Sequence, residues 1–535
     1  MRNDHLRRRF LAGLVPAAGV AAAAAAPQGR TASGEAGFDV RSHGAIGDGA
    51  HLDTKAIQDA VDACARAGGG TVRFPAGAYL SGTIVLKSRV TLDLDAGAVL
   101  LGSKDLQDYP SFVPALRSFT DTYTERSLIY AEGLEDIAIR GRGAIDGQGA
   151  SFRGEYKVRP YLMRFVSCRN VSVTDVGIRN SPMWVQHYLA CLGVEIRGIS
   201  VHSRVNVNND GIDIDGSQRV RISDCEIWSG DDAIVLKATA DRPTKDVVIA
   251  NCVLSSACNA LKLGTESNGG FENIAISNCT IYDTRLAGIA LEMVDGGVLD
   301  RVSVSSILMN GVGTPVFIRL GDRARPFTAG GARPPVGQLR NVSICNVQAA
   351  GAGSMGCAIA GLPGHAIENV VLENVRLTFA GGGKRADARR EIPENAAKYP
   401  EHSMFGTLPA YGFYCRHVKG LSLRGVETGF LKDDERPALV CDDVESLDLA
   451  DSAFAGALEG EPAVRLQQVK DAFVHGCRAP GPIQTWMEVS GGQCQRLSVM
   501  GNDVRYAGKA VDIAGDVPKD AVFVDAAGQV SRPVR

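Results

Sequence analysis

Short segments of one pattern recur along this 535-residue chain. Each alternates apolar with polar residues, as in RVRISDCEI, DVVIANCVL and NIAISNCTI. In these three segments Cys225, Cys252 and Cys279 follow one another at intervals of 27 residues. A repeat of roughly this length that carries several short strands is typical of a parallel β-solenoid, in which each repeat forms one coil.

The repeats continue along most of the chain. Similar segments can be followed from about residue 125 to the C-terminal region, and no linker requires a second domain. The leucine-rich repeat has a comparable period, but the short runs of each unit here are strand-like and lack a helical pattern. We therefore expect an all-β chain, with a single parallel β-helix domain over residues 36–535.

Two stretches interrupt the repeats. The segment ARPFTAGGARPPVG is rich in Pro and Gly and predicts a loop. The longer polar stretch at 380–415 predicts an inserted loop, and loops of this length are often functional. We expect it to fold over the coils and to bring His402, Tyr399 or Arg390 to a ligand. A disordered insertion is the alternative.

A short helix is predicted ahead of the first strands. Asp53 or Thr54 can cap its start, and three glycines at 68–70 end it. The apolar positions between them recur at helical spacing: Ile57, Ala60, Val61 and Cys64. Such a helix could cover the first edge of the strand stack, which would otherwise be open to aggregation.

The N-terminal residues resemble a targeting segment. Three arginines at 7–9 are followed by Phe10-Leu11 and an Ala-rich, mildly apolar run that ends at Ala26. This order predicts an export signal of the twin-arginine type over residues 1–28, and hence a periplasmic or extracellular protein. No later stretch reaches 18 consecutive apolar residues, so we expect no membrane span in the mature chain.

Thirteen cysteines would ordinarily suggest disulfides in an exported protein. Their equal spacing in the repeats indicates otherwise, because stacked coils place such residues one above another as small buried apolar side chains. We expect mostly free thiols. The formal net charge of -3 provides no basic surface, which makes nucleic acid an unsuitable partner.

Three aspartates lie at the starts of two similar strands. Asp210 precedes GIDID, and Asp231 and Asp232 precede AIVLK in the next repeat. If the strands stack, the carboxylates form a cluster in which the pKa values split, as acid and base catalysis on a glycosidic bond requires. Asp231 and Asp232 are neighbours, so both can face one side only if the chain bends at Gly230.

Aligning successive strands predicts which side chains share the outer surface of this sheet. One outward column is expected to contain Asp213, Val235, Lys262, Ala290 and Arg319. The other is expected to contain Asp215, Lys237, Gly264, Glu292 and Gly321. The corner column reads Asp210, Asp232, Asn259 and Ala287. Acids and bases therefore alternate along one strip, which suits a charged sugar chain.

Several motifs together resemble glycoside hydrolase family 28, the polygalacturonase and rhamnogalacturonase group. They are GRGAIDGQG, NSPMWVQH, NNDGIDID, GDDAIVLK and LGTESNGGFENI, between residues 141 and 274. The resemblance implies a right-handed parallel β-helix that hydrolyses pectic chains with inversion, without a metal or other cofactor. By motif, Asp231 corresponds to the general acid. Asp210 and Asp232 correspond to the pair that orients and deprotonates water, with acid and base about 6.5–9.5 Å apart.

Two signatures of that family are missing. Ala257-Cys258-Asn259 stands where the resemblance implies Gly-His-Gly, and Ala290-Leu291-Glu292 stands where it implies Arg-Ile-Lys. Lys262 and Arg319 are candidates to replace the missing carboxylate contact, whereas Glu292 would repel a uronate. The full set of expected substrate contacts is Asn208, His187, Lys237, Asn259, Lys262, Glu292 and Arg319.

Three functions remain open at this point. The first is an exported glycoside hydrolase that acts on a pectin-type, uronate-containing chain. The second is a polysaccharide lyase or epimerase, which could use Asp213 and Asp215 as calcium ligands and Arg319 or Lys262 as its base. The third is a β-helix that binds polysaccharide without cleaving it.

Overall fold

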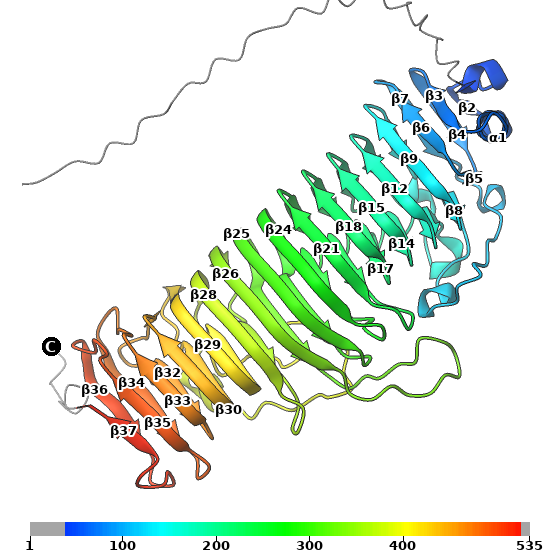
Figure 1. Cartoon of the computed structure of the whole chain (residues 1–535). Coiled ribbons are helices and arrows are strands. Elements are labelled where there is room, and N and C mark those ends of the chain that lie inside the picture. Colours follow the sequence, from blue (N-terminus) through cyan, green and yellow to red (C-terminus); the bar gives the residue numbers. More distant parts are fainter. Residues whose placement is uncertain (1–37, 526–535) are drawn as a thin grey trace, which may run out of the picture. The chain divides into compact units, whose positions relative to one another are not determined.

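The computed structural model describes residues 38–525, and strands dominate them. The expected export signal at residues 1–28 lies outside the described part. Parallel strands stack in three ladders along the chain (Figure 1), and the third of them ends before the last coils. This is the strand stack that the repeats predicted. Short 3-10 helices lie at Val40–His43, Leu106–Asp108, Phe119–Thr122, Gly149–Ser151, Tyr156–Val158 and Arg385–Arg389.

The first ladder carries the aspartates at the start of its strands. It consists of β5 (Ile84–Val85), β8 (Ser127–Glu132), β11 (Tyr161–Val166), β14 (Gln186–Leu189), β17 (Ile212–Asp215), β20 (Ile234–Lys237), β23 (Leu261–Leu263), the last parts of β24 (Phe271–Met293) and β25 (Val298–Leu320), β27 (Cys357–Ala360), the first parts of β29 (Phe413–Lys432) and β30 (Leu439–Ala450), β32 (Val464–Gln467), β34 (Ile483–Ser490) and β36 (Ala507–Ile513).

The other two ladders complete each coil. The second contains β1 (Phe38–Asp39), β3 (Gly70–Phe74), β6 (Val90–Leu94), β9 (Glu135–Gly141), β12 (Arg169–Thr174), β15 (Leu192–Arg197), β18 (Gln218–Ser223), β21 (Thr244–Ala250), β26 (Gln338–Ala352), β28 (Ile367–Gly381), β33 (Lys470–His475), β35 (Gln495–Met500) and β37 (Val522–Val524), with parts of β24, β25, β29 and β30. The third contains β2 (Asp48–Leu52), β4 (Gly77–Ser81), β7 (Ala98–Gly102), β10 (Ala144–Asp146), β13 (Gly177–Arg179), β16 (Ser200–Ser203), β19 (Glu226–Ser229), β22 (Val253–Ser256) and β31 (Ala453–Phe454), with parts of β24, β25, β26, β28 and β29.

The predicted outward columns hold over three strand pairings and fail at the fourth. Asp213 pairs with Val235, Val235 pairs with Lys262, and Lys262 pairs with Ala290, as expected. The next partner of Ala290 is Phe317, however, and Arg319 pairs with Glu292. The prediction for Arg319 was therefore wrong by two residues. A shift of two keeps the alternation of faces, so the apolar pattern could not reveal it.

The stacked cysteines form part of the core. Cys225, Cys252 and Cys279 are buried in consecutive coils, and all 13 cysteines are free thiols. The expectation of free thiols is confirmed. A ladder of thiols is compatible with the fold because each side chain is small and apolar enough to pack above the next.

The residue before each of these cysteines adopts a left-handed backbone conformation. Asp224, Asn251 and Asn278 have φ angles of 58°, 57° and 54°. The amide of Asn251 also donates to the Asp224 carboxylate at 3.2 Å. Asn and Asp tolerate this conformation better than other residues with a Cβ, which explains the polar residue that recurs at this corner.

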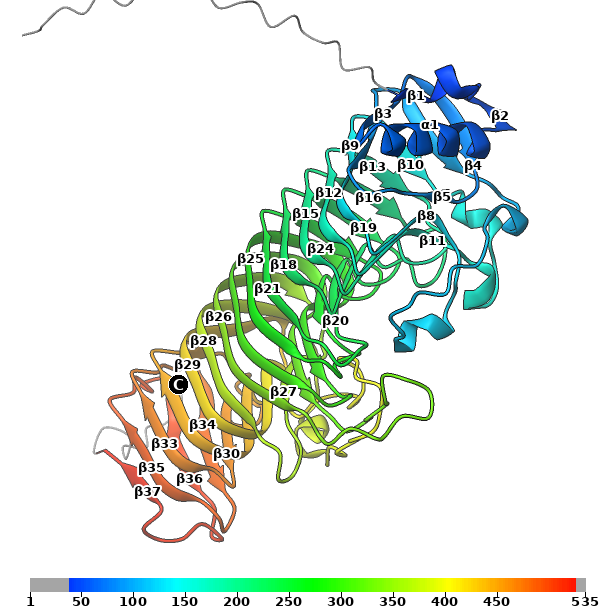
Figure 2. The same cartoon turned by 45° about the vertical axis from the view of Figure 1, so that its right-hand side comes forward.

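The predicted N-terminal helix is present as α1 (Thr54–Arg66), and its apolar residues Ile57, Ala60, Val61 and Cys64 are buried. It lies against β1, β3, β5 and β6 (Figure 2). Asp53 stands at the N-cap position but makes no capping hydrogen bond. Its carboxylate instead accepts from the backbone N–H groups of Ile46 and Gly47, at 2.8 and 2.9 Å.

The left-handed corner leads to a stability prediction. Asn251→Ala places a Cβ-bearing residue without a local polar contact at φ 57° and removes the bond to Asp224. Asn251→Gly removes the same bond without the backbone strain. We expect the Ala variant to be less stable than the Gly variant by about 1 kcal/mol, measured by thermal and urea unfolding. Equal stability of the two variants would contradict this explanation.

Candidate active site

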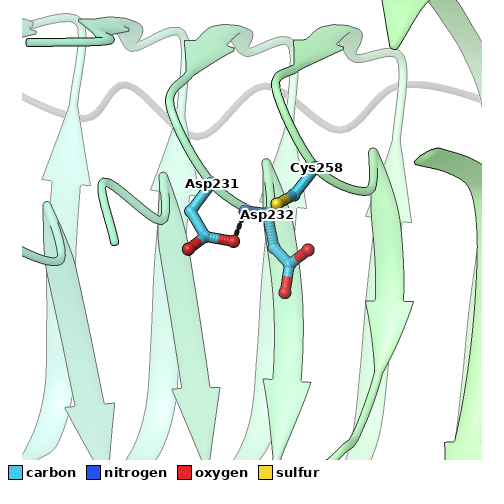
Figure 3. Close-up of side chains that lie close together, drawn as sticks. All are labelled: Asp231, Asp232 and Cys258. Carbon is cyan, nitrogen blue, oxygen red and sulfur yellow. Dashed lines mark hydrogen bonds between the residues drawn. The ribbon is translucent and has the colours of Figure 1, made fainter. Parts of the chain in front are cut away.

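The three aspartates come together at the start of β17 and β20. Asp231 and Asp232 follow the bend at Gly230, and the Asp231 carboxylate accepts from the Asp232 backbone N–H at 3.0 Å (Figure 3). One oxygen of each carboxylate and the Cys258 sulfur lie within 4.8 Å of one another. Asp210 is close enough for the charges of Asp231 and Asp232 to raise its pKa, after burial and Asp213.

Asp232 is surrounded by hydrogen-bond donors. Its carboxylate accepts from the Asn259 side-chain amide at 2.8 Å and from the Asn259 backbone N–H at 3.2 Å. The Lys262 ammonium lies 3.0 Å away. Asn259 is itself held in place, because its amide oxygen accepts from the Ala287 N–H at 3.0 Å. Donors directed at both sides of a carboxylate stabilise its ionised form, which suits a general base.

Asp231 has the opposite surroundings. Burial and then the neighbouring charge of Asp232 raise its pKa, which favours the protonated acid. Asn208 orients it, donating at 3.5 Å to Asp231 while accepting from Arg159 at 2.9 Å. Burial, followed by the charges of Asp231 and Asp232, also raises the pKa of the Cys258 thiol. The thiol therefore stays neutral beside the acid, at the place where the family resemblance implied a His.

Lys237 bridges three acids on the N-terminal side of the cluster. Its ammonium lies 3.6 Å from Asp210, 3.5 Å from Asp213 and 3.6 Å from Glu266. Burial alone would lower the pKa of Lys237, but the charges of these acids outweigh it and raise the pKa well above its usual value. Burial raises the pKa of both Asp210 and Asp213. Glu266 did not figure among the residues expected at the site.

Lys262 bridges two acids on the other side. Besides Asp232, its ammonium lies 3.7 Å from Glu292. Burial raises the pKa of Glu292 to about 8 and that of Glu401 to about 7. Glu401 comes from the long loop, as does Tyr399, whose ring centroid is 5.7 Å from the Lys262 ammonium. The loop thus does reach the site, although the residue that adds a carboxylate there is Glu401.

Two further arginines complete the charged network. Arg323 contacts Asp295 at 2.5 Å, and Arg325 contacts Glu266 at 2.7 Å and Asp295 at 3.1 Å. Arg323 immediately precedes the Pro- and Gly-rich insertion, and Arg325 lies within it. Irregular segments have no repeat register, so strand alignment could not place these side chains.

His187 and Arg319 serve the framework. His187 is fully buried, and its Nε2 lies 3.1 Å from the Asp215 carboxylate. The guanidinium of Arg319, 1% exposed, donates to the backbone carbonyl of Gly361 at 2.9 Å and to that of Glu394, in the long loop, at 2.6 Å. Arg319 therefore fastens the loop to the sheet and is not an open contact on the column of Lys262.

The described acids are poorly arranged for a cation. Asp215 is occupied by His187 and by the Thr239 hydroxyl, at 2.6 Å, and Lys237 stands beside Asp213. Asp231, Asp232 and Cys258 are close enough to hold a metal ion. The Lys262 ammonium already neutralises Asp232, however, and a second cation there would be repelled.

Comparisons with known proteins identify the family of the chain. The model of glycosyl hydrolases family 28 matches residues 64–397. A probable polygalacturonase of Vitis vinifera is 30% identical over 371 residues, which cover 64% of this chain and 74% of that protein. An exo-poly-alpha-D-galacturonosidase of Dickeya chrysanthemi is 26% identical over 347 residues, which cover 53% of this chain and 57% of that protein.

The fold is shared with a solved structure. The exopolygalacturonase of Thermotoga maritima superposes with a TM-score of 0.60 and 20% identity, covering 73% of this chain and 91% of that one. At this identity the likeness establishes the fold alone, and it confirms the expected right-handed parallel β-helix. Because the family match covers more than half of the chain and includes all three aspartates, the protein belongs to glycosyl hydrolases family 28 and is a glycoside hydrolase.

Proposed function

We propose that the protein hydrolyses glycosidic bonds in a pectin-type, uronate-containing polysaccharide or oligosaccharide. The observation that carries this proposal is the contrast between neighbours: Asp231 is half-buried with a raised pKa, whereas Asp232 is surrounded by donors. Two carboxyl groups held in opposite protonation states are what glycoside hydrolysis requires. The names of the relatives, polygalacturonase and galacturonosidase, support the substrate class.

In the proposed mechanism, Asp231 donates its proton to the glycosidic oxygen as the bond to the sugar breaks. Asp232 takes a proton from the attacking water, and Asp210 helps to orient that water. The Lys262 ammonium, 3.0 Å from Asp232, provides a positive charge beside the proposed base. The steps need only side chains of this chain, water and the sugar.

We further propose that the reaction inverts the anomeric configuration. Asp210, on the preceding coil, and Asp232 would hold the water between them, opposite the acid. One carboxylate oxygen of Asp231 lies within 4.8 Å of one of Asp232. The two carboxyl groups of inverting enzymes are usually farther apart, at roughly 6.5–9.5 Å. Proton NMR of the first product formed distinguishes the outcomes: inversion supports a water held by Asp210 and Asp232, and retention would make Asp232 a nucleophile.

The long loop supports action from a chain end. It covers the outer face of the first ladder beyond β23, packing on Ala290, Phe317 and Ala358 (Figure 2). The loop residues of this apolar cluster are Ile392, Met404, Phe405, Leu408 and Ala410. Because the loop occupies the outer face of these first-ladder strands, a polymer cannot extend across them. We therefore propose exo action, in which a chain end enters the site.

The lyase and epimerase alternative is less well supported. Its candidate base Lys262 is held by Asp232 and Glu292, and despite burial these charges and Tyr399 raise its pKa well above the usual value. A lysine so strongly protonated is a poor proton acceptor. The other candidate, Arg319, is buried and bonded to carbonyl oxygens. The binding-protein alternative leaves the acid and base pair without a role.

We also propose that residues 36–535 act as one catalytic domain and that residues 1–28 direct the chain out of the cytoplasm, to the periplasm or beyond. The paired arginines and the Ala-rich run support export. The helices within residues 38–525 include none with the length and hydrophobicity of a transmembrane segment. Cell fractionation of the full chain and of an Arg7→Lys, Arg8→Lys variant tests the proposal, since the variant should remain in the cytoplasm.

The acid assignment predicts the effect of one substitution. Asp231→Asn cannot protonate the leaving group, so kcat should fall about 100-fold or more, while the affinity for oligosaccharide changes little. Asp241→Asn, at an exposed position, serves as the matched control and should keep full activity. Kinetics and calorimetry measure the two effects. Undiminished turnover in Asp231→Asn would rule out its role as the acid.

Hydrolysis and elimination leave different products. We expect turnover of defined pectic oligosaccharides to be unchanged by a chelator, and the products to lack the ultraviolet absorbance of an unsaturated sugar. Loss of activity with the chelator, or growth of that absorbance, would instead support the lyase.

Exo action predicts the time course of products. Reducing ends should accumulate while the viscosity of the polymer falls slowly, and chromatography should show one small product from the start. A broad early distribution of intermediate lengths would contradict exo action.

The buried Glu292 predicts a pH dependence of stability. Its pKa is raised from the usual 4.5 to about 8, so the folded state retains a proton that the unfolded chain has released between these values. Stability should therefore fall as the pH rises through this window, by an amount on the order of a few kcal/mol. Glu292→Gln should lose less than the native chain in thermal unfolding between pH 5 and 8. Exposed Glu226→Gln is the control and should follow the native chain.

A further inference from the structure

We propose that Arg159 is a positioning residue for the general acid: through Asn208 it keeps the proton of Asp231 available to the glycosidic oxygen. This inference rests on the proposed function and adds a residue to its mechanism. It follows from two features of the described residues. Arg159 is a buried cation without an acid partner, and its hydrogen bonds end on the corner that carries Asn208.

The burial of Arg159 needs an explanation. This residue precedes β11 and is 2% exposed. Within residues 38–525 no carboxylate lies at ion-pair distance from its guanidinium, and its Nε donates no hydrogen bond. The ring of Tyr156, whose centroid is 5.3 Å from the guanidinium carbon, provides a cation–π contact but does not neutralise the charge. A buried charge left without an opposite charge lowers stability, which points to a functional reason for keeping it.

The guanidinium holds the corner that leads into β17. Its Nη1 donates to the backbone carbonyl of Val207 at 2.5 Å, and its Nη2 donates to the Asn208 side chain at 2.9 Å. A guanidinium carries donors only, so the Asn208 atom that faces it must be the amide oxygen. The Asn208 nitrogen is thereby turned to Asp231, where it donates at 3.5 Å. Arg159 therefore determines which end of the amide meets the acid.

The orientation of this amide matters for proton transfer. A reversed Asn208 would place its oxygen beside Asp231, and that oxygen would accept the proton that the glycosidic bond needs. In the observed orientation the amide N–H cannot accept a proton. The other oxygen of Asp231 accepts from the Asp232 backbone N–H at 3.0 Å (Figure 3). Both of these neighbours are donors, so neither takes the proton of the acid away from the substrate.

The same contact favours the transition state over the resting state. At 3.5 Å the bond from Asn208 to the protonated acid is weak. When Asp231 loses its proton the bond becomes charge-assisted, and such bonds are shorter, at about 2.7–2.9 Å, and stronger. Arg159 polarises the amide and strengthens this bond further. An interaction that strengthens as charge develops lowers the barrier and leaves substrate binding unchanged.

Two substrates that differ in their need for an acid test the inference. A pectic oligosaccharide requires protonation of its leaving group, whereas the phenolate of a dinitrophenyl α-galacturonide leaves without it. For Arg159→Gln we expect kcat to fall about tenfold or more on the oligosaccharide and about twofold or less on the aryl substrate, with KM unchanged. A merely structural role would lower both rates alike.

Three further variants isolate the route through Asn208. Arg159→Lys keeps a side chain with donors only and should recover part of the lost kcat. Asn208→Ala and the double variant Asn208→Ala, Arg159→Gln should be equally slow on the oligosaccharide, because the two residues act as one unit. Arg153→Gln replaces an exposed arginine of the same segment and should keep full activity.

Equal losses on the two substrates, or additive losses in the double variant, would overturn the inference and leave the hydrolase intact. If Arg159→Gln does not fold, neutron diffraction of the native protein decides: the deuterons of the Asn208 amide should point at Asp231, and an oxygen in their place would refute the role of Arg159. If the native protein cleaves neither substrate, the proposed function fails, and the role of Arg159 fails with it.

Discussion

The site exists because parallel strands in consecutive coils are held in register by backbone hydrogen bonds. The spacing between neighbouring strands, about 4.8 Å, brings side chains of one column within reach of the coil above. Asp210 and Asp232 open paired strands, and Asn259 opens the next. The ladder thereby fixes the heights of Asp210, of the base Asp232 and of the amide that orients the base, although the three come from different coils.

Crowding of carboxyl groups on this ladder has an electrostatic consequence. Buried acids cannot all ionise together, so the positions of two lysines decide which of them do. Lys262 lies close to Asp232, and Lys237 is shared among three acids at longer distances. Asp231 has neither lysine at ion-pair distance and has a raised pKa. The different roles of the two adjacent aspartates therefore depend on whether a lysine of the coils lies close to each of them.

The repeat and the aspartate cluster could be predicted from the sequence because both depend on regular spacing. The register failed at Arg319, where a shift of two residues preserves the pattern of faces. The contributions of Glu266, Arg323 and Glu401 were missed because they come from turns and loops, whose direction no periodicity encodes. After burial, the charge of Glu401 from the long loop also raises the pKa of Glu292, and nothing in the sequence pattern predicted that contact.

Neutron diffraction from crystals of the deuterated protein near pH 6 would locate the protons on the clustered carboxyl groups and so show which aspartate is the acid. We expect a deuteron on Asp231 and none on Asp232, with the Lys262 ammonium directed at Asp232. A deuteron on Asp232 with Asp231 ionised, or the two side chains turned to opposite faces of the sheet, would contradict this expectation.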